Sequence, residues 1–375
     1  MSRLDWLDNL FEQQRAAFNR HPMPPLAQRR QWLKALRLAL IERQEQLVTA
    51  IDQDFDGRSA DETRLAELLP SVQGLAHAEK HLSRWMKAQR RRAGLAFQPA
   101  SARVQYQPLG VVGVIVPWNY PLFLAIGPLT GALAAGNRVM LKLSETTPAT
   151  GEALKALLES VFPTDMVSVV LGEAEVGEAF SRLPFDHLLF TGATSIGHKV
   201  MHAAADNLTP VTLELGGKSP AIVSASVPLA DAAERIAFGK TLNAGQTCVA
   251  PDYVLVPTAR IPGFIEAYRE AVKRFYPQVQ GNRDYTSIIS PRHLARLNDY
   301  LDDARLQGAT VTNLYPDEPL RGRRLPPYLL QDTHDLMRVM QEEIFGPLLP
   351  IVAYERIDDA IAYINQRPRP LALYY

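Results

Sequence analysis

Residues 111–143 have the sequence VVGVIVPWNYPLFLAIGPLTGALAAGNRVMLKL, and this stretch decides the fold. The apolar run 111–116 predicts a buried strand, residues 121–135 predict a helix, and residues 139–143 predict a second strand. Nearly continuous apolar strands that alternate with helices are typical of a parallel sheet covered on both faces. The stretch therefore indicates an α/β fold.

The same alternation continues along the chain. Residues before about 95 have the apolar spacing of amphipathic helices, and the charged run up to Arg92 is expected to be a solvated helix end. A second α/β cycle begins after about residue 215. We therefore predict an α/β protein with two lobes of parallel sheet and an N-terminal helical region. The other expected strands are 167–171, 187–190, 221–223, 253–257 and 349–353, and the other expected helices are 150–162, 174–183, 198–206, 229–243, 262–275 and 292–307.

Composition excludes several classes of protein. The 375 residues include 40 Lys+Arg and 40 Asp+Glu, so the chain lacks the basic surplus of a nucleic-acid-coating protein. One cysteine, Cys248, provides neither an intrachain disulfide nor a thiolate metal cage. We expect no metal site and no nucleic-acid partner, and Cys248 is either a small buried hydrophobe or a reagent.

Targeting signals are not evident in the sequence. The N-terminus mixes charges of both signs, so a cytoplasmic location is expected. No charged residue occurs between Arg103 and Arg138, which calls for a membrane test. The prolines at 117, 121 and 128 and five glycines in this stretch argue against a spanning helix. A strand, a loop and a buried helix fit it better.

The segment 190–197, FTGATSIG, follows an expected strand and precedes an expected helix. Gly192 and Gly197 allow a close approach of the backbone to a ligand, and a helix N-terminus attracts anions such as a pyrophosphate. The usual G-x-G-x-x-G pattern is absent, so a plain strand-to-helix turn is the alternative.

Three residues carry functional groups that suit a catalytic site. Cys248 lies in a polar, glycine-containing segment, which favours a reachable thiol. Glu214 lies between two leucines at the end of an apolar strand, where partial burial would raise its pKa and suit a general base. A salt bridge to Lys218 is the alternative. Asn119 follows the first strand, and its amide could stabilise an oxyanion.

Six motifs together resemble the aldehyde dehydrogenase superfamily over essentially the whole chain, most like the compact class-3 branch and bacterial coniferyl aldehyde dehydrogenases. They are PWN at 117–119, KLSE at 142–145, FTG at 190–192, LELGGKSP at 213–220, GQTC at 245–248 and EEIFGP at 342–347. The resemblance implies two Rossmann-like lobes. It divides the chain into residues 1–95 as the helical part of the cofactor-binding lobe, 96–110 as a bridging strand, 111–213 as the NAD(P)-binding domain and 214–375 as the catalytic domain.

The resemblance also implies the chemistry. Cys248 attacks an aromatic or aliphatic aldehyde to form a thiohemiacetal whose oxyanion is held by Asn119, and Glu214 activates the water that hydrolyses the thioester. The cofactor is NAD, with NADP possible. The residues that the resemblance assigns to it are Trp118, Lys142, Glu145, Gly192, Gly197, Glu343 and Phe345.

The sequence departs from the family pattern at several places. Leu143 replaces the usual proline, and Ala193 replaces a serine, which removes a hydroxyl from the pyrophosphate turn. The chain ends at Tyr375 in an apolar run that resembles an interrupted strand, so a truncated product is expected, with a homodimer if the further segment were present. The alternatives are a CoA-acylating dehydrogenase and a catalytically silent cofactor-binding protein.

Overall fold

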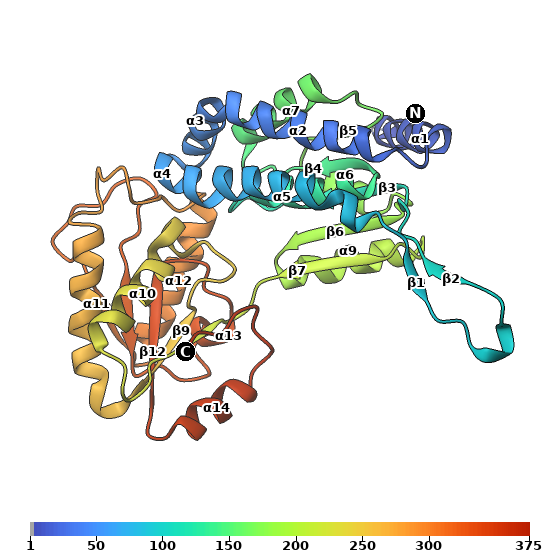
Figure 1. Ribbon diagram of the computed structural model, residues 1–375. Helices are drawn as coiled ribbons and strands as arrows, with labels where there is room; N and C mark the ends of the chain where they lie inside the picture. The colour runs from blue at the N-terminus through green and yellow to red at the C-terminus, as the bar shows by residue number, and fades with distance from the viewer. Residues whose placement is uncertain (1–3) are drawn as a thin grey trace. The chain divides into compact units, whose positions relative to one another are not determined.

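The computed structural model describes residues 4–375, which form two compact units (Figure 1). The first unit contains the residues up to Ala50 and Thr63–Glu214, and the second contains Ile51–Glu62 and Leu215–Tyr375. The short segment Ile51–Glu62 thus belongs with the C-terminal part of the chain, which the sequence did not indicate. The predicted domain boundaries at 95, 110 and 213 stay predictions.

The first unit is built on a five-stranded sheet with the order β5-β4-β3-β6-β7. The pairs β3–β4, β4–β5 and β3–β6 are parallel, as the apolar strands predicted. The strands are β3 (Val111–Ile115), β4 (Arg138–Lys142), β5 (Val167–Val170), β6 (His187–Gly192) and β7 (Val211–Leu215), and the helices between them are α6 (Phe123–Ala135), α7 (Pro148–Val161), α8 (Ala174–Ser181) and α9 (Thr194–Ala205).

The central strand β3 shows why the quoted stretch folds as it does. Four of its five residues are buried, which matches an apolar run that is covered on both faces. A Cβ at Gly113 would lie 2.6 Å from the ring of Phe185, so only glycine fits there. The helix α6 ends at Gly136, whose φ of 93° is left-handed and therefore suits glycine. The chain then enters β4.

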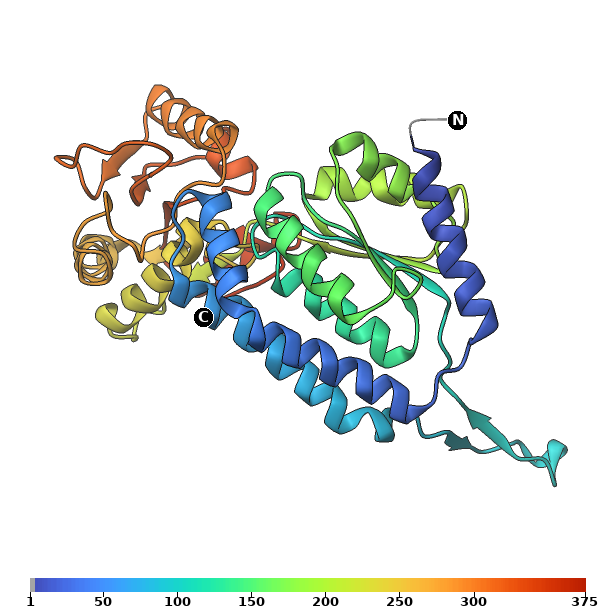
Figure 2. The ribbon, with the colours of Figure 1, turned by 90° about the horizontal axis from the view of Figure 1, so that it is seen from above.

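The N-terminal part of the first unit is helical. The elements are α1 (Asp5–Arg20), α2 (Leu26–Glu42), α3 (Gln44–Phe55), α4 (Ala60–Thr63), a π-helical turn (Arg64–Leu68) and α5 (Leu69–Trp85). Helices α2 and α5 pack side by side (Figure 2), and the leucines buried on them include Leu33, Leu36, Leu75 and Leu82. The amphipathic spacing correctly predicted this region.

The end of that region differs from the prediction. The helix stops at Trp85, and β1 (Gln89–Arg91) pairs antiparallel with β2 (Ala102–Val104). The prediction of a solvated helix end at the arginines was therefore wrong. The backbone there pairs with residues 102–104 instead, and a pattern of neighbouring residues does not reveal this pairing. Every residue of both strands is exposed.

The second unit contains a five-stranded sheet with the order β10-β11-β12-β9-β8. All neighbours are parallel except β10 and β11. The strands are β8 (Pro220–Ile222), β9 (Tyr253–Pro257), β10 (Thr310–Asn313), β11 (Tyr328–Gln331) and β12 (Leu348–Tyr354), and the main helices are α10 (Leu229–Thr241), α11 (Ile261–Phe275), α12 (Pro291–Leu306), α13 (Arg338–Gln341) and α14 (Ile357–Asn365).

Several elements of the second unit were not predicted. They are strands β10 and β11 and helix α14. Their sequences are short or mix apolar and polar residues without a clear helical or strand periodicity. Near the end of the chain, Tyr374 forms an isolated parallel bridge with Ala221 of the edge strand β8. The apolar run there, expected to be an interrupted strand, thus begins to pair at one residue.

The uncharged stretch between Arg103 and Arg138 forms β3, a turn and α6. Within residues 4–375, no helix combines the length and apolarity that a membrane crossing requires.

Candidate active site

Four of the predicted site residues lie at one edge of the first sheet. Trp118 and Asn119 follow β3, Lys142 ends β4 and Gly192 ends β6. Because these strands are parallel neighbours, their carboxyl ends meet at the same edge, where ligand crevices open in such sheets. Asn119 is only 3% exposed, and Trp118 is half-buried. The first unit therefore does bring these residues to one edge.

Lys142 presents a nearly buried ammonium at this edge. Its Nζ donates to the carbonyl oxygen of Leu143 at 2.7 Å and lies 3.6 Å from Oε2 of Glu145. Burial lowers the pKa of Lys142, and the nearby carboxylate of Glu145 opposes that shift. Glu145 itself is about two-fifths exposed. The pair thus offers a cationic donor and an anionic acceptor within one short turn.

The turn after β6 offers backbone groups. A Cβ at Gly192 would lie 2.6 Å from the ring of Phe190, which leaves no room for a side chain. Ala193 is the N-cap of α9 and provides no side-chain hydrogen bond, and Gly197 is buried in the first helical turn. Backbone N–H groups at a helix start are donors for an anion. Because Ala193 stands where the family pattern has serine, no side chain caps the start of α9.

Glu214 differs from its sequence-based expectation. It lies on β7, and its side chain is exposed, so the expected partial burial is not found. The alternative salt bridge to Lys218 is also absent, because Lys218 pairs with Asp252 instead. The reason is that β7 is an edge strand of its sheet, where a carboxylate between two leucines can face water.

Cys248 follows a turn with an unusual backbone. Asn243, Ala244 and Gly245 have φ values of 52°, 51° and 75°, and the left-handed region is costly for the two residues that carry a Cβ. Gln246 fixes the turn, since its Nε2 donates to the carbonyl oxygens of Asn243 and Ser287 and its Oε1 accepts from the N–H of Ile289. Cys248 itself is partly exposed, as a reachable thiol requires.

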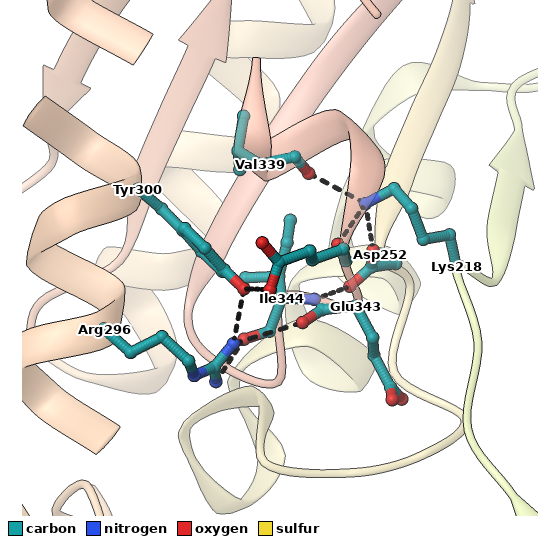
Figure 3. A network of polar contacts seen from close by, with 8 residues as sticks. Lys218, Asp252, Arg296, Tyr300, Val339, Glu343 and Ile344 are labelled. Carbon is teal, nitrogen blue, oxygen red and sulfur yellow. Dashed lines mark hydrogen bonds and ion pairs between the residues drawn. The ribbon is translucent and has the colours of Figure 1, made fainter. Parts of the chain in front are cut away.

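The loop that carries Glu343 and Phe345 is held by a polar network (Figure 3). Lys218 donates to Asp252 and to the carbonyl oxygens of Val339 and Glu342. Asp252 Oδ1 in turn accepts from the N–H of Ile344 at 3.0 Å. The backbone on one side of the loop is thus fixed by an ion pair.

The other side of the loop is fixed from helix α12. Arg296 donates to the carbonyl oxygens of Glu343 and Ile344, at 3.2 and 2.8 Å, and to the hydroxyl of Tyr300. Tyr300 donates to Oε2 of Glu342. Phe345, with a φ of 50°, is left-handed without being glycine, so the network stabilises a strained loop.

The carboxylate of Glu343 points away from Arg296 and Tyr300 (Figure 3), and a Cβ at Gly216 would lie 2.2 Å from it. Burial and the negative charge of Asp252 raise the pKa of Glu343 to about 7, against the hydrogen bond from the N–H of Gly217. A carboxylate that gains its charge near neutral pH is suited to a functional role.

Sequence reasoning missed the supporting residues Asp252, Arg296 and Tyr300. Each lies dozens of residues from the loop that it holds, and none stands out locally from other charged or aromatic residues. Their hydrogen bonds to the loop form only when the second unit is folded, so the sequence alone does not identify them. Tyr374 was also missed as a neighbour of the Cys248 segment, since its hydroxyl donates to the carbonyl oxygen of Val249 at 2.5 Å.

Comparison with known proteins places this chain in a family. The model of the aldehyde dehydrogenase family matches residues 5–374. The chain is 66% identical over 372 residues to a probable coniferyl aldehyde dehydrogenase of Pseudomonas aeruginosa. The alignment covers 99% of this chain and 78% of that relative. It is 48% identical over 340 residues to a coniferyl aldehyde dehydrogenase of a Pseudomonas species, covering 90% and 70% of the two chains.

Solved structures agree. An aldehyde dehydrogenase of Staphylococcus aureus in a substrate-bound state matches with a TM-score of 0.93 at 36% identity, over 98% of this chain and 80% of that one. A Mycobacterium tuberculosis aldehyde dehydrogenase complexed with NAD+ matches with a TM-score of 0.85 at 32% identity, over 94% and 74%. The chain therefore belongs to the aldehyde dehydrogenase family. Its activity is the NAD(P)-dependent oxidation of an aldehyde, which the sequence motifs had indicated.

Proposed function

We propose that the chain oxidises coniferyl aldehyde to the corresponding carboxylic acid, with NAD as the oxidant and Cys248 as the nucleophile. The substrate is supported by the relative that is 66% identical over almost the whole chain. The observation that carries the mechanism is the rigid, left-handed turn that ends just before the partly exposed and only thiol of the chain.

The covalent steps follow from the chemistry of the residues. The Cys248 thiolate adds to the carbonyl carbon, so a C–S bond forms and the carbonyl oxygen becomes an oxyanion, for which the Asn119 amide and the Cys248 backbone N–H are the donors. Bound NAD supplies the chemistry of a hydride acceptor. Glu214 takes a proton from the water that attacks the thioester, and the C–S bond breaks to release the acid and the thiolate. The side chain of Glu214 is exposed, so bulk water has access to it.

The residues present fit a dinucleotide. The Lys142–Glu145 pair offers a donor and an acceptor for ribose hydroxyls, and the Gly192 turn with the start of α9 offers backbone donors for a pyrophosphate. Trp118 adjoins this edge, Gly197 allows close backbone approach, and Glu343 with Phe345 is assigned to the nicotinamide ribose. Glu145 favours NAD because its carboxylate repels a 2′-phosphate, although Lys142 could tolerate NADP.

A cytoplasmic homodimer completes the proposal. The support for self-association is the β1–β2 ribbon, whose connecting residues include Leu95 and Phe97, exposed at 92% and 71%. Clustered exposed apolar side chains are typical of protein interfaces. Light scattering of the purified chain measures its molar mass directly.

The test is an assay of NADH absorbance with coniferyl aldehyde. We expect turnover by the unaltered chain and a loss of kcat of at least roughly 10³-fold in Cys248→Ser and Cys248→Ala. As a control, both variants should bind NAD as the unaltered chain does. Full turnover in either variant would overturn the role of Cys248. Added coenzyme A separates the acylating alternative, because a CoA thioester then replaces the free acid as the product.

A further inference from the structure

The segment Ile51–Glu62 is attached to the second unit by hydrogen bonds to residues 284–287. The N–H of Ser287 donates to the carbonyl oxygen of Gly57 at 2.9 Å, and its hydroxyl donates to that of Asp56 at 2.9 Å. Ser59 donates to Asp284 at 3.5 Å. A piece of the N-terminal region is thus an integral part of the unit that contains the nucleophile.

Glu62 ends this segment as a buried carboxylate, 8% exposed. Its Oε2 accepts from the hydroxyl of Thr286 at 3.2 Å, and its Oε1 lies 3.8 Å from Nη2 of Arg58, whose side chain is fully buried. The N–H of Asn243 donates to it as well. Burial raises the pKa of Glu62, against these three partners. A buried carboxylate is costly unless such partners satisfy it.

The contact with Asn243 connects Glu62 to the nucleophile. Asn243 is the first residue of the left-handed turn, and its backbone N–H is buried, so it needs an acceptor. Its side chain donates to the carbonyl oxygen of Gln246 at 3.1 Å, which closes the turn two residues before Cys248. The conformation at Asn243 therefore sets the path of the chain into Cys248.

The turn has no room to relax gradually. A Cβ at Gly245 would lie 2.4 Å from the carbonyl oxygen of Gly346 and 2.9 Å from that of Lys240. If Asn243 lost its acceptor, the strained φ values at Asn243 and Ala244 would be held by fewer groups, and a rotation there would move the Cys248 sulfur and backbone N–H together.

We propose that Glu62 is a positioning residue for Cys248, which acts by holding the Asn243 N–H and with it the left-handed turn before the nucleophile. This inference rests on the proposed function of Cys248. Glu62 touches no reacting atom. It belongs to the N-terminal part of the chain, yet it adjusts the geometry of a residue 186 positions later (248 − 62).

The experiment compares Glu62→Ala, Glu62→Gln and the control Asp61→Asn in the full chain. Asp61 is the exposed neighbour of Glu62 and loses the same charge. Two readouts are used: kcat and KM with coniferyl aldehyde and NAD, and the pH dependence of Cys248 alkylation by iodoacetamide, followed by mass spectrometry. The alkylation needs neither aldehyde nor cofactor, so it remains informative if the proposed function fails in the NADH assay.

For Glu62→Ala we expect kcat to fall roughly 10–100-fold with KM for NAD within about twofold, because a small displacement of a nucleophile has effects of this size. The alkylation rate or its pH midpoint should change as well. Glu62→Gln keeps an acceptor oxygen for Asn243 and should retain kcat within about fivefold, even though losing the negative charge beside the buried Arg58 lowers its melting temperature. Asp61→Asn should match the unaltered chain in both readouts.

The inference is overturned if folded Glu62→Ala keeps the kcat and alkylation profile of the unaltered chain, or if Glu62→Gln is as slow as Glu62→Ala. If Glu62→Ala does not fold by circular dichroism, Thr286→Val decides instead. It removes one donor to the carboxylate and should lower kcat roughly 3–10-fold, and an unchanged kcat in it would equally reject the role of Glu62.

Discussion

Two turns of this molecule are expected to position reacting groups, and they are built in opposite ways. The turn after β6 consists of exposed backbone, a glycine and the start of α9, and no side chain caps it. The turn before Cys248 is buried, left-handed at residues that carry a Cβ, and held by Gln246, Glu62 and Ser287. The first turn has backbone N–H donors available to a ligand because no side chain caps them. The second keeps a strained shape only because distant groups hold it.

The contrast between the two turns predicts that a substitution at Gly245, in the buried turn, has the largest effect on stability and activity. Gly245→Ala adds a Cβ at a φ of 75° and 2.4 Å from a carbonyl oxygen, so left-handed strain and overlap combine. We expect the free energy of unfolding to fall by about 2–5 kcal/mol and most activity to be lost. Urea denaturation and the NADH assay measure the two effects.

Gly281→Ala is the matched control for this substitution. Its φ is 72°, but nothing lies within 4 Å of the added Cβ, so only the strain of about 1 kcal/mol remains. If the two substitutions lower the free energy of unfolding equally, close packing around the turn before Cys248 is not what restricts position 245 to glycine.

The contrast between the turns also explains what the sequence could predict. The apolar runs of β3 and β4 and the glycines at 192 and 197 carry their information locally, so the first sheet and its ligand edge were predicted. Cys248 could be proposed as the nucleophile because it is the only cysteine and lies in a recognisable motif. Glu62, Asp252 and Arg296 act through partners far along the chain, and the exposure of Glu214 depends on which strand forms the sheet edge. Only the folded structure contains those facts.

A second prediction tests whether charge tunes the loop of the second unit. The raised pKa of Glu343, about 7, means that its carboxylate gains its charge between pH 6 and 8. An ionised carboxylate accepts ribose hydroxyls better, so NAD affinity should rise about tenfold over that range. Glu343→Gln should flatten this profile. Titration of NAD by tryptophan fluorescence at a series of pH values provides the measurement.

The same shift has a consequence for stability without cofactor. The folded chain retains a proton on Glu343 that the unfolded chain loses above pH 4.5, so the contribution of Glu343 to the free energy of unfolding falls as pH rises towards 7. A Glu343→Gln variant that shows the same pH slope as the unaltered chain would contradict the assignment of this titration to Glu343.

The smallest effect is expected at the exposed turn. Ala193→Ser restores a hydroxyl at the N-cap of α9, where it can donate to a pyrophosphate, and NAD affinity should increase about 2–5-fold with kcat unchanged. Ala193→Val, which adds bulk without a donor, is the control. If both variants bind NAD more tightly, or if neither does, a contact between the serine hydroxyl and the cofactor is rejected.

The attachment of Ser59 to Asp284 spans 225 residues, and this separation governs how the chain can fold during synthesis. At the usual translation rate, residues 51–62 wait roughly 10–45 s before residues 284–287 are made. During that interval the first unit can assemble, whereas the second lacks its docking partner. A ribosome-released fragment that ends near residue 280 should therefore contain a protease-resistant first unit, with residues 51–62 open to cleavage.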